Sequence, residues 1–198
     1  MKRSQVVLRD ARADDAEALA RLWGDILRHG DDESRAADVR AVVERIDGHD
    51  DERLVVAEYD GQVAGAVHLR ATTLTPLNLE PVVQAISPHV FSDFRRHGVG
   101  RELMHAAVAF ADERGIEHVA TAAVAGARDA NRFMARLALA PAAILRVAPT
   151  AVVAARLSAQ GPHGGHPTRA GGRQLTHVLA ARRSARRRRA DPAPEASS

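Results

Sequence analysis

Residues 91–103 read FSDFRRHGVGREL and place two glycines, three arginines and a histidine between two apolar runs. An apolar run precedes it, and a helix-like pattern with period 3.6 follows it from Gly100. A glycine-containing turn between a strand and a helix presents backbone N–H groups at the positive end of the helix dipole, where an anion such as a pyrophosphate binds without a metal. Gly98 and Gly100 permit unusual φ angles and a close approach. Arg95, Arg96 and Arg101 add positive charge. The stretch therefore predicts a phosphate-binding loop.

Upstream of this loop, strand-like and helix-like patterns alternate. We expect a strand at 6–8, a helix from Asp14 to Gly30, a second helix from Ser34, a hairpin over 53–70 and a long strand over 79–91. The dipeptide Asp60-Gly61 between two β-rich runs is a strong signal for the hairpin turn. Pro88 removes a backbone donor from the long strand, which indicates a bulge or an edge there.

Downstream of the loop, the same alternation continues. We expect a helix over 100–115, a strand over 116–124, a helix over 127–139, a strand over 142–149 and a helix over 150–159. The order of these elements predicts an α/β fold in which helices flank a mixed sheet.

The composition excludes several classes of protein. The chain has 198 residues and no cysteine, so disulfides, thiolate nucleophiles and cysteine-ligated metals are excluded. No apolar run approaches the ~20 residues of a membrane span, and the N-terminus lacks the apolar segment of a signal peptide. We therefore expect a cytoplasmic protein without a membrane partner.

The charge divides the chain into two parts. Residues 161–198 carry eight arginines and two carboxylates, a charge of +6, so residues 1–160 must carry −3 to give the formal net charge of +3. Composition changes at the same point, from a globular pattern to a Gly- and Pro-rich linker and the run RRSARRRR. We predict one domain over 1–160 and a flexible, basic tail over 161–198. The tail is expected to be solvated, with nucleic acid or another polyanion as an alternative partner.

The loop matches one phosphate-binding motif and not two others. The chain contains neither G-x-x-x-x-G-K-[ST] nor a fitting G-x-G-x-x-G. The pattern [Q/R]-x-x-G-x-[G/A] fits, with Arg95, Gly98 and Gly100 in its fixed positions. In this context the loop resembles motif A of the GNAT superfamily of N-acetyltransferases. The order of elements from Val6 to Val147 is similar to that of the family.

The resemblance implies a fold, a cosubstrate and a set of site residues. The fourth strand would splay from the fifth, and acetyl-CoA would lie in the gap with its pantetheine against the backbone near Val90. Its pyrophosphate would bind to the amides of the loop. The implied cofactor-binding residues are Val90, Arg95, Arg96, His97, Gly98, Val99, Gly100 and Arg101. Transfer to an amine would be direct, with no metal and no covalent enzyme intermediate.

The sequence departs from the family at the residue that often serves as general acid. The segment ANRFMARLAL places Met134 where the family has a tyrosine, Ala138 where it has a glycine and Leu139 where it has a phenylalanine. A thioether cannot donate a proton. The one tyrosine of the chain, Tyr59, adjoins the hairpin turn and is expected to be a strand residue.

The usual base position is also changed, since it falls on Gln84, whose amide is not a useful proton acceptor. Glu80, His89 and His118 are alternative candidates, each with a scaffold role as the competing interpretation. The catalytic residues therefore stay unassigned, and two functions stay open. One is acyl transfer from acetyl-CoA to an amine. The other is a catalytically weak CoA-binding protein whose basic tail contacts nucleic acid or a partner.

Overall fold

The computed structural model describes residues 5–122 and 126–160, and it divides into two compact units, Met1–Pro141 and Ala142–Ser198. The first unit holds all the strands of the described residues and the predicted loop. The second holds, in its described part, the predicted helix over 150–159, which is α5 (Thr150–Ala159). The linker and Arg-rich tail predicted over 161–198 lie outside the described residues. The boundary after Gln160 stays a prediction.

The first unit is built on a five-stranded mixed sheet in the order β1-β2-β3-β4-β5. Its strands are β1 (Val6–Asp10), β2 (Glu52–Tyr59), β3 (Gln62–Thr73), β4 (Pro81–Val90) and β5 (His118–Thr121). The first four pair antiparallel, and β5 pairs parallel with β4. Positive φ angles at Asp60 (50°) and Gly61 (80°) form the predicted tight turn between β2 and β3.

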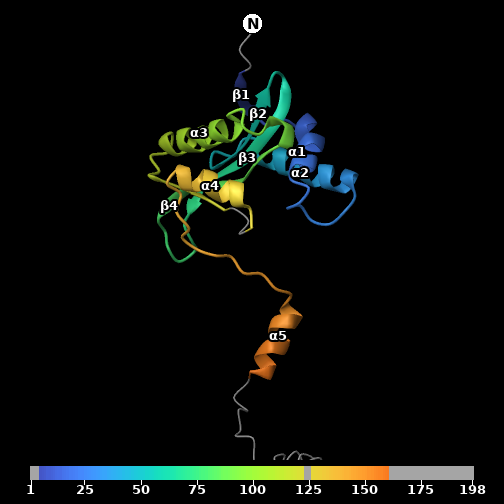
Figure 1. Cartoon of the computed structure of the whole chain (residues 1–198), viewed down its shortest axis with the longest axis vertical. Coiled ribbons are helices and arrows are strands. Elements are labelled where there is room, and N and C mark those ends of the chain that lie inside the picture. The colour runs from blue at the N-terminus through green and yellow to red at the C-terminus, as the bar shows by residue number, and fades with distance from the viewer. Residues whose placement is uncertain (1–4, 123–125, 161–198) are drawn as a thin grey trace, which may run out of the picture. The chain divides into compact units, whose positions relative to one another are not determined.

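Helices cover both faces of this sheet, so the predicted α/β class is confirmed (Figure 1). On one face lie α1 (Ala16–Leu22), which follows a short 3₁₀ turn, and α2 (Asp32–Ile46). On the other lie α3 (Val99–Asp112) and α4 (Arg128–Arg136). The alternation of side chains along each strand separates the two cores. On β2, for example, Val55 packs towards α3, whereas Val56 packs against α1 and α2.

Two sequence-based expectations about elements were wrong. The first helix ends at Leu22 and not at Gly30, because Trp23 leaves helical geometry (φ −103°, ψ 17°) and turns its indole towards β4. No strand forms over 142–149, although the segment is rich in β-branched and other apolar residues. Such residues favour a strand only where a neighbouring strand completes the ladder, and Pro141 and Pro149 bracket this segment.

Candidate functional site

A bulge interrupts β4 at the proline, as the sequence predicts. Ala66 pairs with His89 and His68 with Ile86, so two residues of β4, Ser87 and Pro88, lie opposite a single residue of β3. The φ of Ser87 is +49°, a conformation that bends the strand. The carbonyl oxygen of Ser87 accepts a hydrogen bond of 2.9 Å from the indole Nε1 of Trp23. The bulge is thereby fixed to the end of α1.

In the described residues, β4 pairs with β5 only ahead of the bulge. Their ladder runs from Val82 with His118 to Ala85 with Thr121, and the Thr121 hydroxyl donates to the Ala85 carbonyl at 2.8 Å. Among the described residues, the remaining half of β4, as far as Val90, pairs with β3 alone. Residues 123–125, which follow β5, lie outside the described residues, so the splay of the fourth and fifth strands stays a prediction. It would leave backbone hydrogen-bonding groups of β4 without a β5 partner, at the place where the resemblance puts the pantetheine.

β3 approaches β4 closely at the end of β4, beyond the bulge. A Cβ atom built on Gly65 would lie 2.6 Å from the carbonyl oxygen of His89 and 3.1 Å from Cγ1 of Val99. Only glycine fits between the end of β4 and the start of α3. Sequence reasoning missed this residue, because a glycine inside a β-rich run gives no sign of what it will face.

The predicted loop connects this strand end to α3 and presents free backbone donors. Arg96 and Gly98 have positive φ angles of 67° and 85°, and Gly98 is the N-cap of α3. The Gly98 carbonyl accepts from the amide of Arg101 at 2.9 Å, so that amide is occupied. The amides of residues 96–100 donate to no group in the described part of the chain. Five N–H groups thus remain for an anion at the positive end of a 14-residue helix.

An aromatic cluster holds the loop in place. The ring of Tyr59 meets the His97 ring edge-on with centroids 4.9 Å apart, and it lies 5.9 Å from the ring of Phe94. Nδ1 of His97 is 2.9 Å from the carbonyl oxygen of Arg95, which fixes the orientation of the imidazole. Tyr59 is half-buried and is a strand residue, as expected. Its contact with the loop was not foreseen from the sequence.

The helix α4 closes the other side of the loop. Phe133 lies next to Gly100, with its Cζ atom 3.7 Å from the position of a Cβ on that glycine. Met134, at the family's tyrosine position, is buried, and Leu139 packs against the core beneath α3. Ala138, at the family's glycine position, has a φ of +61°. The backbone has therefore kept the left-handed conformation that normally favours glycine.

The candidate acid and base residues lie in different settings. Gln84 lies on the paired half of β4, opposite Arg70 of β3. Glu80 and His118 form an exposed pair, with Oε1 and Nδ1 3.6 Å apart, at the far end of the β4–β5 ladder. His89 alone among the three candidates lies beside the bulge. Its Nδ1 is 3.1 Å from the Ser87 carbonyl oxygen, and its Nε2 is 3.7 Å from Oδ1 of Asp25.

Other charged groups form the scaffold rather than the site. Arg9 of β1 binds Asp15 through two hydrogen bonds of 2.7 and 2.8 Å and also binds Glu58 at 2.6 Å. These hydrogen bonds from Arg9 hold the pKa of the buried Asp15 below its ordinary value. A cavity of about 150 Å³ lies at the end of α2, and no residue of β4, of the loop or of α3 lines it.

Residues 5–122 and 126–160 contain neither a membrane-spanning helix nor a recognisable metal site. None of their helices has the length and apolar character that crossing a membrane requires. Their His, Asp and Glu side chains form no group of three placed to hold a metal ion.

Solved structures share this fold. A transcriptional regulator from Bacillus halodurans C-125 is 20% identical, with a TM-score of 0.62 over 73% of this chain and 99% of that one. An aminoglycoside N-acetyltransferase, AAC(6')-Iy, in complex with CoA is 18% identical, with a TM-score of 0.61 over 76% of this chain and 98% of that one. Glucosamine-6-phosphate N-acetyltransferase from Arabidopsis thaliana is 18% identical, with a TM-score of 0.57 over 74% and 99%. At these identities the likeness concerns the fold.

The family assignment comes from the sequence and not from the structural neighbours. No curated protein matches the chain. The model of the acetyltransferase (GNAT) family matches residues 16–138, which is more than half of the chain and includes the bulge, the loop and α4. The chain therefore belongs to the acetyltransferase (GNAT) family of enzymes.

Proposed function

We propose that this protein transfers an acetyl group from acetyl-CoA to an amine by direct attack within a ternary complex. One observation carries the proposal: five free backbone amides, at residues 96–100, lie at a helix N-terminus next to the end of β4, whose second half pairs only with β3 in the described residues. A chain of this family needs both features, one for a pyrophosphate and one for an extended, amide-containing arm. The family match supports acyl transfer in general.

The cosubstrate would lie across the predicted splay of β4 and β5. Its pantetheine would pair with backbone groups near Val90, and its pyrophosphate would accept from the free amides of residues 96–100, with Arg95 and Arg101 adding charge. The loop has room for such a group, because a Cβ atom built on Gly98 meets nothing within 4 Å. The amides need no metal to bind an anion in this position.

We assign the proton acceptor to His89. The Ser87 carbonyl can only accept a hydrogen bond, so Nδ1 of His89 carries the proton and the lone pair is at Nε2. Asp25, 3.7 Å from Nε2, would stabilise the imidazolium once a proton arrives. As the amine nitrogen bonds to the carbonyl carbon, its proton passes to Nε2 directly or through one water. The C–S bond then breaks, and the leaving thiolate takes a proton from solvent.

The acceptor is an amine of a small molecule or peptide. Two of the structural neighbours are named for amine-bearing acceptors, an aminoglycoside and glucosamine 6-phosphate. Residues 1–160 are acidic overall, which favours a cationic acceptor that approaches as an ammonium ion. Such an acceptor loses one proton to solvent before attack, and its second proton passes to His89 as the C–N bond forms.

A second candidate function is a CoA-binding protein with weak catalysis. Met134 favours it, because a buried thioether occupies the place where the family often has its general acid. The amide Gln84 at the usual base position favours it as well. The two functions predict the same affinity for acetyl-CoA and different turnover.

Calorimetry with acetyl-CoA tests the cosubstrate site. We expect the parent to bind, and a Gly98→Trp variant to lose affinity because its side chain fills the anion position. Gly115→Trp is the matched control: Gly115 also has a positive φ (62°) and open space, but it lies beyond the other end of α3. Unchanged affinity in Gly98→Trp would contradict the pyrophosphate assignment.

Thiol release with a panel of amines tests turnover. We expect His89→Gln to lower kcat about 10²-fold or more while acetyl-CoA affinity stays within twofold, because general-base contributions have this size. Tight binding of acetyl-CoA by the parent without release of thiol on any amine would favour the second function.

A further inference from the structure

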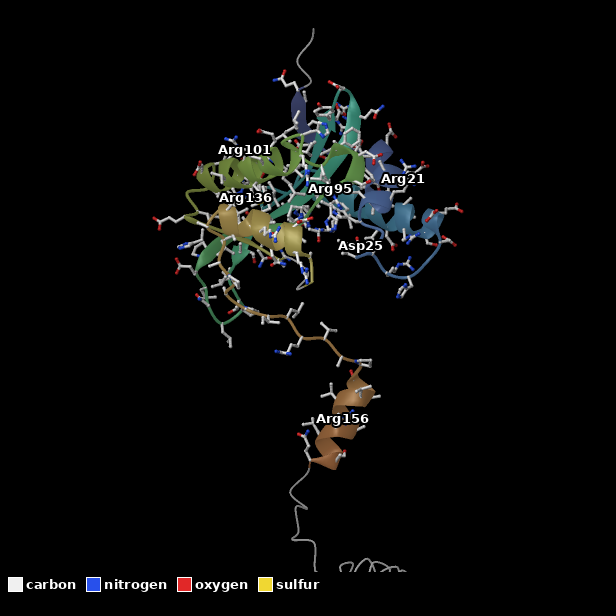
Figure 2. All side chains as sticks on the ribbon, in the orientation of Figure 1. Arg21, Asp25, Arg95, Arg101, Arg136 and Arg156 are labelled. Carbon is white, nitrogen blue, oxygen red and sulfur yellow. The ribbon has the colours of Figure 1, made fainter. Side chains whose placement is uncertain are left out.

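The arginines of the first unit differ in whether a carboxylate neutralises them. A carboxylate oxygen lies within 4.0 Å of every arginine on β1, β2 and β3. The same is true of most arginines on α2. Six arginines of the loop, α3 and α4 have no such partner in the described part of the chain: Arg95, Arg96, Arg101, Arg128, Arg132 and Arg136. Figure 2 shows the elements from which three of them come, with Arg95 on the loop, Arg101 on α3 and Arg136 on α4.

Three of these arginines form a stripe along α4. Arg128, Arg132 and Arg136 are spaced by four residues, so their side chains follow one side of the helix at intervals of about 6 Å. Like charges at this spacing repel each other and destabilise a helix slightly. A bound anion would remove that repulsion.

Phe133 of α4 neighbours both the end of the stripe and the loop. The guanidinium carbon of Arg136 lies 6.0 Å from the centre of the Phe133 ring. The Cζ atom of the same ring is 3.7 Å from the Cβ position on Gly100. One aromatic side chain is therefore next to both a cation of α4 and the start of α3, which carries free amides that we assign to the pyrophosphate.

Coenzyme A carries more negative charge than its pyrophosphate. A third phosphate is esterified to the 3′ oxygen of the ribose and is close to dianionic at neutral pH. We assign the free amides of the loop to the pyrophosphate, so a protein contact to the 3′-phosphate would come from a second set of donors. Guanidinium groups bind phosphate oxygens through paired hydrogen bonds, which suits an arginine stripe beside the loop.

We propose that Arg132 and Arg136 of α4 bind the 3′-phosphate of the CoA cosubstrate. This inference rests on the proposed function, since it extends the same site from the pyrophosphate to the ribose. Arg128, one turn earlier, adds to the field at that position. The site would therefore select CoA thioesters over thioesters of shorter carriers that lack the 3′-phosphate, such as phosphopantetheine.

Calorimetry of the full chain with CoA and with 3′-dephospho-CoA tests the inference. We expect the parent to bind CoA about tenfold or more tightly than 3′-dephospho-CoA, since a charge-assisted contact is worth about 1.5 to 3 kcal/mol. In an Arg132→Gln/Arg136→Gln double variant this preference should fall to about twofold or less. Affinity for 3′-dephospho-CoA should stay within about twofold of the parent value.

A matched control separates local contact from net charge. Arg21 on α1 and Arg40 on α2 are exposed and also have no carboxylate partner in the described residues, so an Arg21→Gln/Arg40→Gln double variant removes the same two charges from the opposite face of the sheet. It should leave the preference for CoA intact. A double variant that loses affinity for both ligands equally would overturn the inference, because the arginines would then serve the pyrophosphate.

Equal affinity of the parent for the two ligands would also overturn the inference while leaving the proposed function in place. Failure of the parent to bind either ligand would overturn both. The two failures are thus distinguishable in one set of titrations.

Discussion

The carbonyl oxygen of His89 lies 2.6 Å from the position that a Cβ atom on Gly65 would occupy. Real Cβ atoms do not approach an oxygen so closely, so any other residue at 65 must push β3 away from the end of β4. This contact fixes the strand end that carries both Val90 and the proposed base.

A Gly65→Ala variant is expected to be less stable by about 1 to 3 kcal/mol, because the added methyl group meets backbone and not a flexible side chain. Urea unfolding measures the loss. Gly30→Ala is the control, since its nearest neighbour would be 3.7 Å away and its φ is not positive. Equal stability of Gly65→Ala and the parent would show that the strands can separate freely here.

An Ala138→Gly variant is expected to be more stable by about 0.5 to 1 kcal/mol. Ala138 adopts a φ of +61° after α4, and a left-handed conformation strains every residue that has a Cβ. Thermal unfolding measures the gain. Ala130→Gly inside α4 should have the opposite effect, with a loss of about 1 kcal/mol, because glycine is a poor helix former. Destabilisation by both changes would contradict the strain at 138.

The Arg9–Asp15 pair is expected to make the free energy of unfolding depend on pH in the acid range. Hydrogen bonds from Arg9 lower the pKa of Asp15 in the folded state below the ordinary value of 3.8. A lowered folded pKa gives stability that is present above pH 3.8 and is lost as the pH falls through the folded value. At pH 7 we expect Asp15→Asn to cost about 2 to 3 kcal/mol, because Arg9 loses its buried partner.

The difference in unfolding free energy between the parent and Asp15→Asn should narrow as the pH falls below 3.8. Asp14→Asn, at the exposed neighbouring position, should match the parent at every pH. A constant difference across the acid range would contradict the role of the ionised carboxylate.

His68 is expected to destabilise the fold when it takes up a proton. Burial is the main cause that lowers its pKa below the ordinary value of 6.5, although Glu52, 3.0 Å from Nε2, opposes the shift. The unfolded chain binds this proton more readily, so stability should decrease as the pH falls below 6.5. A His68→Gln variant should lose part of that decrease. His29→Gln, at an exposed position, should retain it, and unfolding curves at several pH values measure both.

A chain that ends after Gln160 is expected to bind acetyl-CoA with unchanged affinity. All the residues that we assign to the cosubstrate lie in the unit Met1–Pro141, and the truncation removes only the Gly-rich linker and the basic segment. Calorimetry at two salt concentrations measures the dissociation constant of acetyl-CoA for the shortened chain and for the full chain. A large loss of affinity would show that the domain boundary was placed wrongly.

Local signals in the sequence were sufficient to predict the loop, the hairpin and the bulge. Asp60-Gly61 and Gly98 each require a backbone conformation that few residues adopt, and Pro88 removes a donor from a ladder. Such effects act within a few residues, so they can be read without knowing the fold. The α/β order could be predicted for the same reason, since each helix and strand carries its own period.

Contacts between distant segments could not be predicted in this way. Gly65 is needed because of a carbonyl 24 positions further along the chain, and Phe133 lies next to a glycine of another element. The strand expected over 142–149 did not form, although its composition was suitable. A strand also requires a neighbouring strand to pair with, and the sequence of one segment does not show whether such a neighbour exists.

The contact between Trp23 and the bulge has a practical consequence for optical experiments. Trp23 is the single tryptophan of the chain, it is buried, and its indole N–H donates to the Ser87 carbonyl. Excitation of indole therefore samples one environment, beside the carbonyl that also orients His89. The emission of the unlabelled protein will report on the state of the β4 bulge, so strand movement there can be followed in real time without a dye or an isotope.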